Sequence, residues 1–231
     1  MTPVDYWLLD FKHNWRVFLS KKSNMIEMAI TLAFFYIISY MFKINLVWLE
    51  GIKGVQLNDF FINLIPAQDV SVYIFVVLYW VVFYTYILLL AYPKFLKFTF
   101  QFYIICLAIR LMMIYFVNLE PPVNLVFLED PILNSTTYSG YKITKDLFFS
   151  GHAVSIVVCY FVMPNHFVKK VILILSFVLF LFLLMQHIHY TIDIAGAFIV
   201  VLLIYKVFYV KKIQNISDKY QHSKEIINLK L

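Results

Sequence analysis

Residues 70–92 read VSVYIFVVLYWVVFYTYILLLAY, an apolar run that contains no charged side chain. A helix that crosses the hydrocarbon core of a bilayer needs roughly 20 mostly apolar residues, and this run is long enough. Five further segments have the same character, although the fourth along the chain is short because Pro164-Asn165 stops it. The predicted spans are residues 25–42, 70–92, 98–117, 150–163, 168–187 and 190–210. The sequence therefore predicts an all-α integral membrane protein with about six transmembrane helices.

The composition agrees with this fold class. Of 231 residues, 63% are hydrophobic and 14% are charged, whereas a soluble domain is nearer half apolar and a quarter charged. The formal net charge of +6 would suggest nucleic acid in a soluble protein; here it indicates lysines that border membrane spans, and no nucleic-acid partner is expected. Cys106 and Cys159 both lie in apolar runs, so neither a disulfide nor a metal site is predicted.

The N-terminal segment differs from the spans because its apolar residues, from Trp7 to Leu19, recur at helical spacing among basic ones. Residues 1–24 are therefore predicted to form an amphipathic helix that lies in the membrane interface. Residues 25–210 are predicted to be a six-helix catalytic domain in the membrane, and residues 211–231 a basic cytoplasmic tail.

The distribution of lysine and arginine predicts the orientation. These residues are concentrated in the N-terminal segment, in the loops after the second and fourth spans, and in the tail. The opposite side carries four lysines: Lys43, Lys53, Lys142 and Lys145. By the positive-inside rule both termini are predicted to be cytoplasmic. Segments 43–69 and 118–149 and the turn near residue 188 then lie on the extracytoplasmic side.

Two short polar motifs stand at the edges of apolar runs on that extracytoplasmic side. One is Asp146-Leu147-Phe148-Phe149-Ser150-Gly151-His152, and the other is His189-Tyr190-Thr191-Ile192-Asp193. Ionisable residues are costly near lipid and usually mark function there. Because the topology brings both motifs to one face of the membrane, a catalytic site is predicted at the extracytoplasmic helix ends.

The residue types in these motifs suit phosphoryl transfer through a covalent histidine intermediate. If a helix begins near Tyr190, His189 and Asp193 lie one turn apart, so the carboxylate can hold one ring nitrogen while the other attacks. His152 stands at a helix start, where exposed N–H groups favour phosphate oxygens. It can protonate a leaving oxygen and later deprotonate an incoming hydroxyl. Asp146 can in turn hold the His152 ring.

Other polar residues in and near the spans leave alternatives open. Arg110, inside the third span, either binds lipid phosphate, forms a structural ion pair or snorkels toward a boundary. Lys142 and Lys145 either attract anionic headgroups or are solvated loop residues. The remaining histidines are interpreted as interfacial or hydrogen-bonded structural residues: His13, His166, His187 and His222.

The two motifs resemble those of the type 2 phosphatidic acid phosphatase superfamily, and most closely those of its sphingomyelin synthase branch. That branch carries an aspartate, three residues and Ser-Gly-His, followed later by His-Tyr-Thr-x-Asp. The resemblance implies that His189 is the nucleophile, that Asp193 supports it, and that His152 is the general acid and base. Asp146 matches an acidic residue of the family by position, and Glu120 is a looser acidic candidate. The residues expected to bind substrate are Arg110, Glu120, Ser150, Gly151 and Tyr190.

The departures from the superfamily's phosphatases are informative. The Lys-x6-Arg-Pro motif of those enzymes is absent, and their Ser-Arg pair before the last histidine is Phe182-Leu183 here. Such arginines hold a phosphomonoester with close to two charges, whereas a phosphodiester bears one and needs less cationic help. A diester lipid is therefore favoured as substrate. The Cys-Gly often found before the synthase aspartate is Thr144-Lys145 here, which leaves the exact lipid open.

Three functions are consistent with these sequence features. The leading one is transfer of a phospho-headgroup from a membrane phospholipid to ceramide or another lipid alcohol, with diacylglycerol as product and no cofactor or metal. The second uses the same histidines with water as acceptor, as in a lipid phosphatase or phospholipase C-like hydrolase. The third is a non-catalytic transporter or scaffold, which would be expected to show inverted repeats and broken helices. The short loops and the Ile/Lys/Asn/Phe-rich composition favour a bacterial inner membrane.

Overall fold

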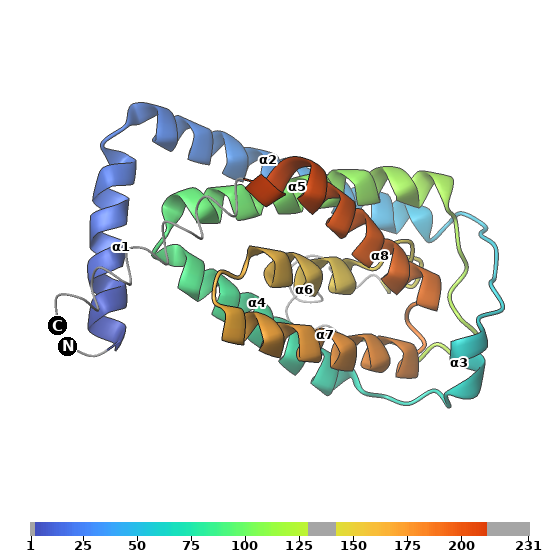
Figure 1. The fold of residues 1–231 in the computed structure, drawn as a ribbon. Helices are drawn as coiled ribbons and strands as arrows, with labels where there is room; N and C mark the ends of the chain where they lie inside the picture. The colour runs from blue at the N-terminus through green and yellow to red at the C-terminus, as the bar shows by residue number, and fades with distance from the viewer. Residues whose placement is uncertain (1–2, 129–141, 212–231) are drawn as a thin grey trace.

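The computed structural model describes residues 3–128 and 142–211, and within these ranges the regular structure is helical. A β-bridge joins Val55 to Leu119. The helices are α1 (Pro3–Leu19), α2 (Lys22–Leu49), α3 (Phe60–Leu64), α4 (Ser71–Leu90), α5 (Pro93–Phe116), α6 (Gly151–Val162), α7 (His166–Met185), α8 (Thr191–Ile204) and η2 (Tyr205–Tyr209), a π-helix that continues α8 (Figure 1). The predicted tail lies outside the described residues except for Lys211.

Five of these helices are long and apolar enough to cross a membrane: α2, α4, α5, α7, and α8 together with η2. The all-α membrane fold is thereby confirmed. The first span is longer than its predicted range of 25–42, because α2 continues to Leu49. Its last turns pack Leu46 and Leu49 in one buried cluster with Leu111 of α5, which stabilises the helix beyond the charged residue Lys43.

The sixth apolar helix, α6, is short and central. Its 12 residues extend about 18 Å at 1.5 Å per residue, less than the roughly 30 Å of a bilayer core. It contacts α4, α5, α7 and α8, and eight of its residues are buried: Ala153, Val154, Ile156, Val157, Val158, Cys159, Phe161 and Val162. α6 is therefore too short to cross a bilayer by itself, so five of the described helices, and not the six predicted, are long enough to span it. The first turn of α6 lies among the surrounding helices (Figure 1).

Helix α1 lies crosswise at one end of the bundle (Figure 1). Three hydrogen bonds join it to the turn between α4 and α5. Asn14 Nδ2 donates to Ala91 O at 2.9 Å, Trp15 Nε1 donates to Leu90 O at 2.7 Å, and Tyr92 donates its hydroxyl to Asp10 at 2.9 Å. This crosswise placement is the one that an interfacial helix would have.

The opposite end of the bundle carries α3 and the starts of α6 and α8 (Figure 1). Glu50, just after α2, fixes the segment that leads into α6, because its carboxylate accepts hydrogen bonds from Thr144 N at 2.6 Å and Lys145 N at 2.8 Å. Both polar motifs therefore lie at the same end of the bundle, as the sequence predicts. Which side of the membrane this end faces stays a prediction.

Candidate active site

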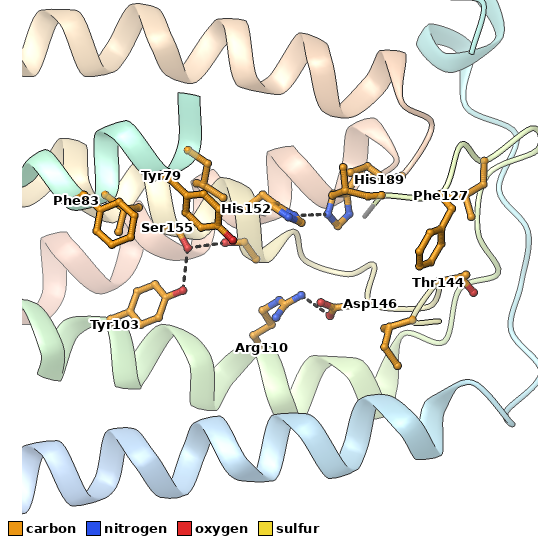
Figure 2. Close-up of a pocket in the computed structure, with 17 residues that line it drawn as sticks. Tyr79, Phe83, Tyr103, Arg110, Phe127, Thr144, Asp146, His152, Ser155 and His189 are labelled. Carbon is orange, nitrogen blue, oxygen red and sulfur yellow. Dashed lines mark hydrogen bonds and ion pairs between the residues drawn. The ribbon is translucent and has the colours of Figure 1, made fainter. Parts of the chain in front are cut away.

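The two motif histidines meet at this end of the bundle. His152 is the second residue of α6, and His189 immediately precedes Tyr190, the N-cap of α8. The distance between His152 Nδ1 and His189 Nε2 is 3.4 Å (Figure 2). A backbone hydrogen bond of 3.1 Å from Ser150 N to Asp193 O ties the two motifs together. Residues far apart in the sequence thus form one constellation.

Asp193 lies beside His189, although His189 precedes α8 and is not on the helix itself. Its Oδ2 lies 3.4 Å from His189 Nδ1 and accepts a 2.8 Å hydrogen bond from Tyr190 N. This 3.4 Å contact does not have hydrogen-bond geometry, and His189 Nδ1 and Asp193 Oδ1 have no hydrogen-bond partner among the described residues. Catalytic hydrogen bonds are often long without substrate and tighten on binding. The arrangement leaves Nε2 of His189 directed at His152.

Arg110 of α5 is buried and binds the segment before α6. Its guanidinium forms an ion pair with Asp146, and its Nε donates a 2.6 Å hydrogen bond to Phe149 O. Asp146 is predicted above to hold the ring of His152; in the structure its carboxylate is paired with Arg110 (Figure 2), and its role toward His152 stays a prediction. Burial alone would raise the pKa of Asp146, but the charge and hydrogen bond of Arg110 keep that pKa below its usual value.

Gly151 has a steric reason to be glycine. A Cβ atom at this position would lie 2.9 Å from Cζ of Arg110 and 3.0 Å from one of its terminal nitrogens. The guanidinium therefore packs directly over the glycine backbone. In the Ser-Gly-His motif, the serine caps α6 through a 3.3 Å hydrogen bond from Ala153 N, and the glycine leaves room for Arg110.

A cavity of about 420 Å³ joins these groups to the apolar interior. Its polar part contains His152, His189, Arg110 and Asp146. Its apolar part is lined by α4 and by residues before α6 and α8: Leu78, Tyr79, Val82, Phe83, Leu125, Phe127, Leu128, Ile143 and Ile188. A cavity with one charged part and one apolar part suits an amphiphilic ligand whose phosphate faces the histidines.

A comparison with protein families gives a match over the part of the chain that carries both motifs. Residues 145–211 match the family model described as PAP2 superfamily C-terminal. This match supports the PAP2 superfamily. The matched stretch includes both histidines and both motif aspartates. PAP2 proteins are phosphatases and related phosphotransferases, so an enzyme that acts on lipid phosphates is supported. No curated protein matches the chain.

Three of the residues expected to bind substrate are not among those that line the cavity: Glu120, Ser150 and Tyr190. The Glu120 carboxylate accepts hydrogen bonds from Gly54 N at 2.7 Å and from Lys145 Nζ at 2.9 Å, and the bond from Lys145 lowers the pKa of Glu120. The Tyr190 hydroxyl donates to Glu120 O at 3.0 Å and accepts from Leu57 N at 3.2 Å. The contacts of these residues support the loops around the site, and Arg110 and Gly151 remain at the cavity.

Asp59 is a supporting residue that the sequence reasoning missed. Its carboxylate accepts hydrogen bonds from Phe61 N at 3.0 Å, from Thr191 N at 2.6 Å and from the Thr191 hydroxyl at 3.0 Å. One aspartate therefore caps both α3 and the helix that carries Asp193. An aspartate before a helix is a recognisable N-cap, but its contact with Thr191 depends on tertiary structure.

His187 has the hydrogen-bonded structural role that the sequence predicts. Its Nδ1 lies 2.9 Å from Val123 O, and its Nε2 lies 2.9 Å from Ile65 O. The residue has φ 54°, in the left-handed region, where the chain reverses between α7 and α8. His187 thus joins three loops beside the site without lining the cavity.

Proposed function

We propose that the protein is a phospholipid headgroup transferase of the sphingomyelin synthase type. The observation that carries the proposal is the His152–His189 pair at the polar part of an otherwise apolar cavity. The donor is a membrane glycerophospholipid, the acceptor is a lipid alcohol such as ceramide, and diacylglycerol is released. The site is expected to face the extracytoplasmic side of a bacterial inner membrane.

The charge of the cavity supports a phosphodiester substrate. Among the described residues that line the cavity, Arg110 is the only residue with a lysine or arginine side chain, and it forms an ion pair with Asp146. Leu183, which stands where the phosphatases carry an arginine, is fully buried. A phosphomonoester with close to two charges would need more cationic partners than this site offers.

The first half of the proposed reaction forms a phosphohistidine. His189 Nε2 attacks the phosphorus of the donor lipid, while Asp193 stabilises the positive charge that develops on the ring. The bond from phosphorus to the glycerol oxygen breaks, and the protonated His152 ring donates a proton to that oxygen. Diacylglycerol leaves, and the phospho-headgroup remains on His189.

The second half returns His189 to its starting state. The neutral His152 takes the proton of the acceptor hydroxyl, and the hydroxyl oxygen attacks phosphorus as the phosphorus–nitrogen bond breaks.

The distance of 3.4 Å between His152 Nδ1 and His189 Nε2 is too short for a phosphoryl group to lie between the two rings. The donor phosphate must therefore part the two rings on binding.

The experiment that tests the proposal is lipid mass spectrometry on purified protein in a bilayer. The bilayer would contain ceramide together with phosphatidyl-choline, -ethanolamine, -inositol and -glycerol. We expect a new phospho-headgroup ceramide and an equal amount of diacylglycerol, and neither product with His189→Ala. His166→Ala is the matched control, because His166 is exposed at the start of α7, outside the cavity.

Two results would change the assignment. Diacylglycerol without the ceramide product would indicate the hydrolase that uses water as acceptor. Turnover that is unchanged in His189→Ala would contradict the phosphohistidine route altogether.

A further inference from the structure

A pair of hydroxyl groups lies in the cavity beyond the histidines. Tyr103 of α5 and Ser155 of α6 both line the cavity, and their hydroxyl oxygens are 2.8 Å apart (Figure 2). Ser155 follows His152 by three residues on α6, so it lies on the same face about 4.5 Å along the helix axis. The mechanism proposed above uses neither hydroxyl.

The direction of the hydrogen bonds in this pair follows from counting protons. Ser155 Oγ lies 3.0 Å from Gly151 O and donates to it, because a carbonyl oxygen can only accept. A serine hydroxyl has one proton, so Tyr103 must donate its own proton in the contact with Ser155. When both hydrogen bonds are made, both protons are used. The pair then offers the cavity only acceptor lone pairs.

A lone pair in apolar surroundings selects a ligand that can donate a hydrogen bond. Val82 and Phe83 line the same cavity. A lipid bound against these apolar side chains would exclude water from the two hydroxyl groups. A lipid with only ester groups at this depth has no proton to give and leaves the acceptors unpaired, which is costly in an apolar setting.

We propose that Tyr103 and Ser155 form a specificity site that accepts a hydrogen bond from an N–H donor in the linkage region of the acceptor lipid. An amide N–H beside the reacting hydroxyl, as in a lipid with an amide-linked acyl chain, has the required chemistry. The one-turn separation from His152 allows the reacting oxygen to lie at the histidines while the neighbouring amide reaches Tyr103. This inference rests on the proposed function for the identity of the reaction, and its test uses binding alone.

The test compares lipid binding by His189→Ala protein, which is expected not to turn over substrate, in phosphatidylcholine nanodiscs by native mass spectrometry. The probes are ceramide and N-methylceramide, which lacks the amide proton. We expect ceramide to bind about fivefold more tightly than N-methylceramide, the effect of one hydrogen bond. Adding Tyr103→Phe should abolish this preference. Adding Ser155→Ala should reduce it, because the Tyr103 proton is then released for donation to the lipid.

Tyr86→Phe, also made in the His189→Ala protein, is the matched control. Tyr86 is a partly buried tyrosine of α4 that packs against Phe100 and is not among the cavity-lining residues, so its variant should keep the preference. Equal binding of the two ceramides, or a preference that survives Tyr103→Phe, would overturn the inference. A Tyr103-dependent preference without headgroup transfer by wild-type protein would contradict the proposed function and leave the specificity site standing.

Discussion

At the scale of single residues, the contact between Gly151 and Arg110 decides how the site is built. Because Gly151 has no Cβ atom, the guanidinium can pack against its backbone; a Cβ atom at residue 151 would lie only 2.9 Å from Cζ of Arg110. We predict that Gly151→Ala lowers kcat/KM by about tenfold to a hundredfold, because the added methyl would displace the guanidinium and a misplacement of about 1 Å can cost about a hundredfold in rate. Headgroup transfer measured by mass spectrometry checks this. Gly51→Ala is the control, since its nearest contact would be an ordinary 3.5 Å; equal losses in both variants would contradict the steric explanation.

The ion pair between Asp146 and Arg110 gives a pH dependence at the same scale. Because the folded pKa of Asp146 lies below its usual value, ionised Asp146 stabilises the fold at pH values above the unfolded pKa of about 3.9. That stabilisation is lost as the pH falls through the lower folded pKa. The Tm of wild-type protein should therefore be higher than that of Asp146→Asn at neutral pH, and this difference in Tm should shrink below about pH 4. A difference that widens in acid would contradict this assignment.

At the scale of elements, the starts of α3 and α8 share one cap. Asp59 accepts hydrogen bonds from the N-termini of both helices, and α8 carries Asp193. Loss of a cap costs about 1 kcal/mol, so Asp59→Ala should lower the Tm by several degrees and also lower activity per folded molecule. Asn165→Ala removes the cap of α7 at the other end of the bundle; it should lower the Tm and leave activity per folded molecule unchanged. Equal activity losses would rule out a specific role for Asp59.

At the scale of the whole molecule, both histidine motifs lie at the end of the bundle opposite α1 (Figure 1). The positive-inside rule predicts that this end is extracytoplasmic. In intact cells, a membrane-impermeant maleimide should label Lys53→Cys, an exposed position after α2, and should label His166→Cys only after permeabilisation. The native cysteines, Cys106 and Cys159, are buried, so wild-type protein should give little background. Labelling of His166→Cys alone would reverse the predicted orientation.

The sequence by itself determined the features that depend on local patterns. Runs of apolar residues set the spans, because the length of a membrane helix is imposed by bilayer thickness. The spacing of His189 and Asp193 predicted their proximity, although His189 precedes α8: the Asp193 carboxylate reaches back over the first turn of the helix to Tyr190 N, beside His189. The end of the first span was missed, because α2 continues to Leu49 through packing against α5, which local hydropathy does not record.

Only the tertiary structure decided which partner each polar group has. Asp146 forms an ion pair with Arg110, and Glu120 holds Lys145 outside the cavity. The Tyr103–Ser155 pair also joins residues from two different helices. Buried polar groups are costly when unpaired, and Arg110, Tyr103 and Ser155 are paired with groups that packing brings within reach. Each such partner is set by how the helices pack, and a single sequence does not encode it in any local pattern.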